Sequence, residues 1–362
     1  LEWQPDSMTN ILFRPSVSWS TSDGRNNGTS ASYNKDPYTI TTDPLSDEGI
    51  DELEKAEAMV NKQLSCGLSY SENKSVNGML QYNRKLGNKG RNVTLRMDAS
   101  YRNNDSENLS LNNAKLYLVK TAAGLDSTYQ TNRYNLTPSK NYSYSAQATY
   151  SEPLWKATFL QFSYKFTYSY SKSDRSTYDF SKYSFEGITP EYRAWNAYLN
   201  PFAGHLDDYK DDNLSRFSEY KNYTHDIQVM MRFIRQKYNL NFGVMIQPQQ
   251  SKYIQDYQGV HVDTVRNVTN ISPTLDFRYR FSKMSNLRVN YRGTTSQPSI
   301  SQLLDITDNS DPLNISKGNP GLKPSFTQNF RLFYNNFVQN HNKGVMTFIN
   351  FSTTSNSISN KV

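Results

Sequence analysis

The chain has 362 residues, of which 14% are aromatic, including 27 Tyr and 18 Phe, although only 36% are hydrophobic overall. Leu and Ala, which build long helical cores, are sparse, so the composition favours an all-β protein, and the absence of any run of about 18 apolar residues excludes a membrane-spanning helix. The formal charge of +7 is spread along the chain rather than gathered in one stripe, which argues against a nucleic-acid partner.

The single cysteine, Cys66, excludes an internal disulfide framework, and we expect it to be a half-buried strand residue. Residues 1–5 do not form a charged and then apolar export signal. If the protein is exported, we expect that signal to lie outside this sequence.

The first predicted strand covers residues 11–19, where apolar and polar side chains alternate. Pro15 has no N–H and therefore indicates a sheet edge or a bulge within this strand. A long polar excursion follows and contains a predicted helix from about Asp47 to Lys62, whose acidic start suits the positive end of the helix dipole.

The same alternation predicts ten further strands along the rest of the chain. The clearest covers residues 160–170, where Phe and Tyr point one way and Gln, Ser, Lys and Thr point the other. Its length suits a tilted strand that crosses a bilayer. The other nine are residues 64–82, 93–101, 142–150, 223–233, 238–246, 275–281, 287–292, 326–334 and 345–351.

The hairpin at residues 275–292 shows why this sheet is expected in a membrane. Its two strands carry Leu, Phe, Tyr and Val on one face and Asp, Asn and Arg on the other. The pattern recurs along the whole chain, and nothing in the sequence supplies a second layer to cover the apolar face. An apolar face without protein cover is typical of a transmembrane antiparallel β-barrel, which faces lipid.

The connections are expected to alternate between short turns and long polar loops, as in barrels of the bacterial outer membrane. Eleven strands would leave an open sheet with two unpaired edges, which lipid does not tolerate. We therefore expect residues 1–362 to be one barrel segment, about half of a larger barrel or a barrel completed by another chain.

An ordered set of motifs resembles the barrel of TonB-dependent receptors of Bacteroidota, in particular their outer membrane β-barrel subgroup. The most recognisable element is Gly318-Asn319-Pro320-Gly321-Leu322-Lys323-Pro324, which follows Tyr291-Arg292-Gly293-Thr294-Thr295-Ser296-Gln297-Pro298. Further matches, at residues 10–16, 150–154 and 223–228, extend the resemblance over nearly the whole chain.

The resemblance implies a barrel of about 22 strands, filled by an N-terminal plug, that binds a nutrient at the extracellular face. Import would use energy relayed by the TonB system through that plug, which this sequence does not contain. The expected partners are outer-membrane lipid, the TonB system and a surface lipoprotein.

Two groups of charged residues are candidate functional sites. Arg278, Arg280, Arg288 and Arg292 share the polar side of one hairpin and hence the lumen, where they either attract an anionic solute, grip the plug, or are solvated charges paired with carboxylates on neighbouring strands. Asp207, Asp208, Asp211 and Asp212 lie in a polar loop and form either a Ca²⁺ site or a solvated acidic loop.

The remaining motifs predict neither a cofactor nor catalysis. The sequence has no HExxH, Gly-x-Ser-x-Gly or phosphate-cradling loop. Gly318-Asn319-Pro320 is interpreted as a turn, and Trp195 either stacks on a ligand or belongs to an interface girdle. The alternatives to a nutrient receptor are a passive pore or barrel-anchored structural component of a surface complex, and a soluble, secreted all-β adhesin.

Overall fold

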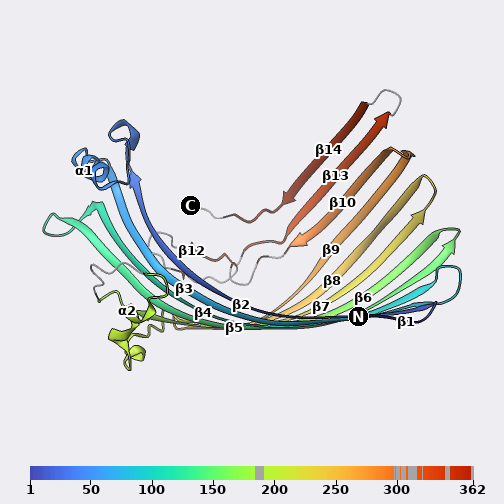
Figure 1. Ribbon diagram of the computed structural model, residues 1–362, viewed down its shortest axis with the longest axis horizontal. Coiled ribbons are helices and arrows are strands. Elements are labelled where there is room, and N and C mark those ends of the chain that lie inside the picture. Colours follow the sequence, from blue (N-terminus) through green and yellow to red (C-terminus); the bar gives the residue numbers. More distant parts are fainter. Residues whose placement is uncertain are drawn as a thin grey trace.

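The computed structural model describes residues 1–183, 191–296, 298, 302, 307–308, 316–319, 321–338 and 343–359. Within them, twelve antiparallel strands form one sheet in which each strand is hydrogen-bonded to its neighbours in chain order. The sheet curves into an open trough (Figure 1). Its strands are β1 (Glu2–Asp6), β2 (Thr9–Tyr33), β3 (Met59–Lys85), β4 (Asn92–Lys120), β5 (Asp126–Trp155), β6 (Thr158–Asp179), β7 (Arg216–Ile234), β8 (Tyr238–Tyr257), β9 (Val260–Ser282), β10 (Ser285–Ser296), β13 (Ser325–Val338) and β14 (Lys343–Ser355).

Short elements occupy the connections at one end of the trough. Two α-helices, α1 (Asp47–Lys55) and α2 (Trp195–Leu199), lie in the β2–β3 and β6–β7 connections. A separate two-stranded sheet is formed by the segment that connects β10 to β13 in the sequence. The remaining elements are η1 (Pro37–Thr39), η2 (Asn200–Phe202), η3 (Leu206–Tyr209), β11 (Thr307–Asp308) and β12 (Ser316–Lys317).

The strand register gives the sheet one apolar and one polar face, as the alternation predicted. One register row runs from β2 to β8 on the apolar face and carries Ile11, Tyr82, Leu95, Ala148, Tyr164, Ile227 and Ile246. Large side chains on this face lack cover from the chain, since Phe162 is 46% exposed and Phe351 is 59% exposed. Such a face is suited to hydrocarbon, and its apolar band spans about ten residues per strand.

The apolar face is the convex face of the trough. In Figure 1, α2 lies beneath the curved sheet, and the hydrophobic cluster to which α2 belongs includes Leu68, Leu109 and Tyr134 of the apolar face. The polar face is therefore concave. In agreement, Arg266 on the polar face of β9 donates a hydrogen bond of 2.9 Å to the carbonyl oxygen of Pro298 in the β10–β13 connection, whose strand β12 is drawn within the trough in Figure 1.

The structure corrects the predicted lengths of several strands. Residues 102–141 and 247–274, read from the sequence as polar loops, are mostly strand, because β4 pairs with β5, and β8 with β9, almost to the connecting turn. Beyond the membrane the two faces of a strand contact water or the protein's own connections instead of lipid, so the strict hydropathy alternation disappears while the backbone pairing continues. Long polar loops therefore do not alternate strictly with short turns.

The strand count is also corrected, from eleven to twelve in the described sheet. The missed strand is β1, which pairs with the start of β2 across Ser7 and Met8. Its sequence, Glu-Trp-Gln-Pro-Asp, has no alternation that would reveal it. Eleven antiparallel strands would make the first and the last strand run in the same direction, whereas with twelve strands they run in opposite directions. Pro15 lies where β1 has ended and β2 forms the sheet edge, as predicted.

The predicted helix is confirmed but ends seven residues earlier, at Lys55 rather than near Lys62. The Ser46 hydroxyl caps the helix by accepting a 3.0 Å hydrogen bond from the N–H of Gly49. The acidic residues of its start, Asp47 and Glu48, lie in its first turn. Glu57 then adopts a left-handed φ of 50°, which turns the chain into β3. None of the described helices is long and apolar enough to cross a membrane.

Away from the short turns, part of the convex face is covered by the chain itself. Phe180, Tyr198 and Phe202, from the β6–β7 connection, pack with Leu68, Leu109, Leu111, Tyr134 and Tyr178 of the strands, and all eight are buried. We call residues 191–209 the outer cover. Because the strands project into water here, their apolar side chains need this protein cover.

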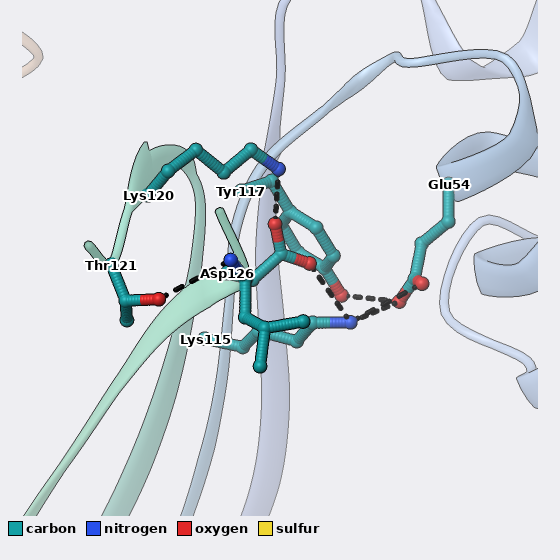
Figure 2. Close-up of polar contacts among 7 residues, drawn as sticks. Glu54, Lys115, Tyr117, Lys120, Thr121 and Asp126 are labelled. Atoms are coloured by element: carbon teal, nitrogen blue, oxygen red, sulfur yellow. Dashed lines mark hydrogen bonds and ion pairs between the residues drawn. The ribbon is translucent and has the colours of Figure 1, made fainter. Parts of the chain in front are cut away.

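The helix α1 covers a second part of the convex face and is held there by a polar network (Figure 2). The Lys115 ammonium lies between Glu54 of α1, at 3.2 Å, and Asp126 of β5, at 3.4 Å. The Tyr117 hydroxyl donates a 2.5 Å hydrogen bond to Glu54, and Lys120 pairs with Asp126. The network therefore ties α1 to β4 and β5.

This network is expected to weaken at alkaline pH. Burial first, and then the hydrogen bond and charge of Glu54, raise the pKa of Tyr117 above its ordinary value of 10.0. The stabilisation that the neutral Tyr117 hydroxyl gives the folded protein is therefore complete below pH 10 and is lost as the pH rises through the raised pKa of Tyr117. An absorbance titration at 295 nm should show that Tyr117→Phe removes one phenol that ionises above the bulk of the tyrosines. Loss of a phenol from the main transition would contradict the assignment.

Candidate functional site: the concave polar face

The concave face is lined by hydroxyl, amide and charged side chains because alternate residues of every central strand are polar. Neighbouring strands are linked there by short side-chain bonds, including Ser18 to Ser75 at 2.7 Å and Ser100 to Ser143 at 2.8 Å. Gln247 donates to Asp226 at 2.6 Å. Such a surface is suited to water and polar solutes.

A basic pocket of about 640 Å³ lies on this face near the short turns. It is lined by Gln236, Arg278, Arg280, Ser282, Lys283, Asn286, Arg288 and Phe333. At this end the connections β1–β2, β3–β4, β5–β6, β7–β8 and β9–β10 are all short, as at the periplasmic end of an outer-membrane barrel, so the pocket lies at the periplasmic end of the lumen.

Three of the four predicted arginines line this pocket. Arg278 and Arg288 are directly opposite each other in the β9–β10 register, and Arg280 is opposite Asn286. Arg288 donates to Asp276 at 2.9 Å, and Asn290 donates to the same carboxylate at 3.3 Å. Two like charges directly opposite each other repel, and a single carboxylate cannot neutralise both.

Arg292 shares the polar face but is not among the residues that line the pocket, because it lies opposite Thr274 and Asn329, further from the short turns. Sequence reasoning missed Gln236, Lys283 and Asn286. Gln236 and Lys283 lie in turns, where alternation gives no information on facing. They could be found from the strand order, because pairing of β8 with β9 places the β7–β8 turn beside the β9–β10 turn.

The four aspartates are not gathered into one site. Asp207 and Asp208 lie in η3, and the side chains of Asp208 and Asp212 are 76% and 92% exposed. The Asp211 carboxylate accepts backbone hydrogen bonds from Asn213 at 2.8 Å and Leu214 at 3.2 Å. Within the described ranges, no group of three or more His, Cys, Asp or Glu side chains is placed to hold a metal ion.

Three other residues noted in the sequence, Trp195, Asn319 and Cys66, contribute to packing or to a turn. Trp195 is half-buried in the outer cover, 6.3 Å from the ring of Tyr134, so it packs within the protein. Asn319 accepts a 2.8 Å hydrogen bond from the N–H of Gly321, which is the side-chain turn chemistry expected here, while Pro320 lies outside the described residues. Cys66 is half-buried in β3 as predicted, and burial raises the pKa of its thiol.

Comparison with known proteins identifies the family to which this sheet belongs. Residues 84–362 match the model of the outer membrane protein β-barrel family. The chain belongs to this family. This match confirms the outer membrane β-barrel part of the resemblance noted from the motifs. The protein resides in the bacterial outer membrane and belongs to a family of membrane barrels rather than of enzymes. No curated protein matches the chain.

Solved structures of larger outer-membrane receptors are similar to this chain at low identity. The siderophore receptor of Acinetobacter baumannii is 9% identical, with a TM-score of 0.38, over 94% of this chain and 55% of that one. The ferric yersiniabactin uptake receptor of Yersinia pestis is 9% identical, with a TM-score of 0.37, over 93% and 53%. The alcaligin receptor of Bordetella pertussis is 9% identical, with a TM-score of 0.36, over 96% and 52%. The chain therefore spans about half the length of these structures.

Proposed function

We propose that this chain is the barrel portion of an outer-membrane nutrient receptor that imports a ligand bound at its extracellular face with energy from the TonB system. The observation that carries the proposal is the polar concave face with its basic pocket, within a member of an outer-membrane barrel family. The ordered motifs of the sequence, which resemble the barrels of TonB-dependent receptors, support the energy coupling.

The tall strands support a role at the extracellular side. In β4 and β5 the paired backbone continues for about fifteen residues beyond Tyr101 and Tyr142, and so forms a wall above the membrane. Walls of this kind surround an entrance lined by polar groups, the environment in which loops and strand ends select solutes. The nutrient is not specified by these side chains, which suit sugars, peptides and metal chelates equally.

The basic pocket supplies an anion-binding function within this transporter. Opposed Arg278 and Arg288 repel each other, so an anionic solute or an anionic surface of a plug that bridges them would be stabilised. Replacing Arg278 with Gln should therefore raise the stability of the anion-free barrel by about 0.2–1 kcal/mol. The same substitution should also abolish the additional stabilisation that about 1 mM pyrophosphate gives the parent protein.

Chemical unfolding of the complete protein in detergent, with and without pyrophosphate, measures both effects. Arg14→Gln is the matched control, because Arg14 lies on the polar face of β2 and is not among the residues that line the pocket. Equal stabilisation of the parent and both variants by pyrophosphate would contradict an anion site at the arginines.

The transport function is tested by accumulation of a radiolabelled nutrient that supports growth only when the complete protein is present. The proposal predicts that a protonophore stops accumulation, and that the purified protein gives no steady conductance in a planar bilayer. Energy-independent uptake with constant conductance would support the passive pore. No uptake role and no conductance would support a structural component of a surface complex.

A further inference from the structure

A belt of tyrosines crosses the convex face near the end of the sheet that carries α1 and the outer cover. Tyr101, Tyr142 and Tyr170 occupy one register row on β4, β5 and β6, and Tyr144, Tyr168 and Tyr223 occupy the next. The rings contact one another, with centroids 4.7 Å apart for Tyr142 and Tyr170 and 5.0 Å apart for Tyr168 and Tyr223. Tyrosine belts lie at the level of lipid headgroups, so this belt marks the outer-leaflet interface.

Lysines follow the belt directly on the same face. Lys140, Lys172 and Lys221 each lie two residues beyond a belt tyrosine on β5, β6 and β7, and therefore share its face. Lys140 is directly opposite Lys172, and Lys221 is directly opposite Lys252 of β8. Two like-charge pairs directly opposite each other are each destabilising unless an anion compensates them.

The two pairs differ in how the protein compensates them. Lys221 has Glu219 at 2.5 Å, and Lys252 has Asp263 at 3.6 Å. Lys172 lies directly opposite Glu219 on β7, so this one carboxylate is shared between Lys172 and Lys221. The ammonium groups of Lys140 and Lys172 otherwise lie against aromatic rings, 5.6 Å from the Tyr101 ring centroid and 5.2 Å from that of Phe217. Aromatic rings hold an ammonium in place without neutralising its charge.

We propose that Lys140 and Lys172 form a binding site for the phosphate-bearing headgroup of an anionic lipid in the outer leaflet. Lysine stems can extend along apolar surface while the ammonium groups reach the interface, which suits these two residues because they lie in the register row two residues beyond the Tyr142–Tyr170 row of the belt. One phosphate between the opposed ammonium groups removes their repulsion, and the lipid's acyl chains continue along the apolar band below. Lys221 and Lys252 extend the cationic row along the next two strands.

Native mass spectrometry of the complete protein, released from detergent micelles, tests this site. The probes are dioleoyl phosphatidylglycerol and dioleoyl phosphatidylcholine, which share acyl chains and a phosphodiester but differ in net charge. We expect the parent to bind phosphatidylglycerol about 25-fold more tightly, and removal of each lysine to weaken that preference about fivefold. The double variant Lys140→Gln/Lys172→Gln should bind both lipids equally.

Two further variants separate the charge from the fold. Lys165→Gln is the matched control, because Lys165 lies on β6 like Lys172 but on the concave face, opposite Gln147. Lys140→Arg/Lys172→Arg keeps both charges and should keep the preference. Heat-dependent gel mobility reports whether each variant folds.

Equal affinity of the parent for the two lipids would overturn the proposal, as would a preference that survives in the double Gln variant. Competition by about 10 mM inorganic phosphate, far above micromolar lipid, would show a site for soluble phosphate instead of a lipid. Loss of preference in Lys165→Gln would also overturn it, since that lysine faces the lumen.

Discussion

Arginine in place of Val229 is expected to destabilise the barrel by about 2–4 kcal/mol, the cost of a charge on the lipid face near the middle of the bilayer. Val229 lies in the middle of the apolar part of β7, between Phe162 and Val244 in the register, and is 38% exposed within the chain. The guanidinium would replace apolar contact with hydrocarbon. Urea unfolding of the complete protein in lipid vesicles measures the loss.

Arginine at the adjacent residue, Gln228, is the matched control. Gln228 lies on the concave face, between Ser163 and Met245 in the register, where water solvates a charge. Its free energy of unfolding should change by less than about 0.5 kcal/mol, as for ordinary surface substitutions. Equal losses at residues 228 and 229 would contradict the assignment of the two faces.

Alanine in place of Phe202 is expected to detach the outer cover, with a local cost of about 3–5 kcal/mol for the deleted ring. Phe202 is 2% exposed and stacks on Phe180, with ring centroids 3.9 Å apart and planes inclined by 2°. Tyr209 meets the same ring edge-on at 4.8 Å. Hydrogen–deuterium exchange should therefore speed up throughout residues 191–209, while exchange in the membrane band of β4 to β7 stays slow.

Asn196→Ala is the matched control for the outer cover. Asn196 lies in α2 beside buried Tyr198 but is itself exposed, so its side chain contributes little to the cluster. Unchanged exchange in Phe202→Ala, or faster exchange in both variants, would show that the stacked phenylalanines do not hold the segment.

The membrane-spanning part of the fold was predictable because lipid on one side and water on the other impose strict alternation. Residues 160–170 show this in full, and they lie within the longer β6 of the structure. The strand extensions above the membrane were not predictable, since they contact water and the protein's own connections instead of lipid, and backbone pairing alone leaves no strict hydropathy signal. The strand β1 was missed for a related reason, because all five of its residues are exposed.

The candidate site was predictable only in part. Alternation placed Arg278, Arg280 and Arg288 on one face, and the structure gathers them at one pocket with the turn residue Lys283. The position of Trp195 was not predictable, because the outer cover packs on strands that lie 60 to 130 residues away in the sequence, including those of Leu68 and Tyr134. Sequence patterns specify local facing well and distant packing poorly.

In the membrane, the convex face contacts lipid while the concave face lines a water-accessible lumen. The most direct test places a nitroxide in turn at each of residues 226–231 on β7 in the complete protein in lipid nanodiscs. Spin-label relaxation then reports collisions with oxygen, which concentrates in lipid, and with a polar nickel chelate, which stays in water. Oxygen collisions should peak at Ile227, Val229 and Met231, and chelate collisions at Asp226, Gln228 and Met230. The same collision profile at all six residues, or the reverse alternation, would contradict the claim.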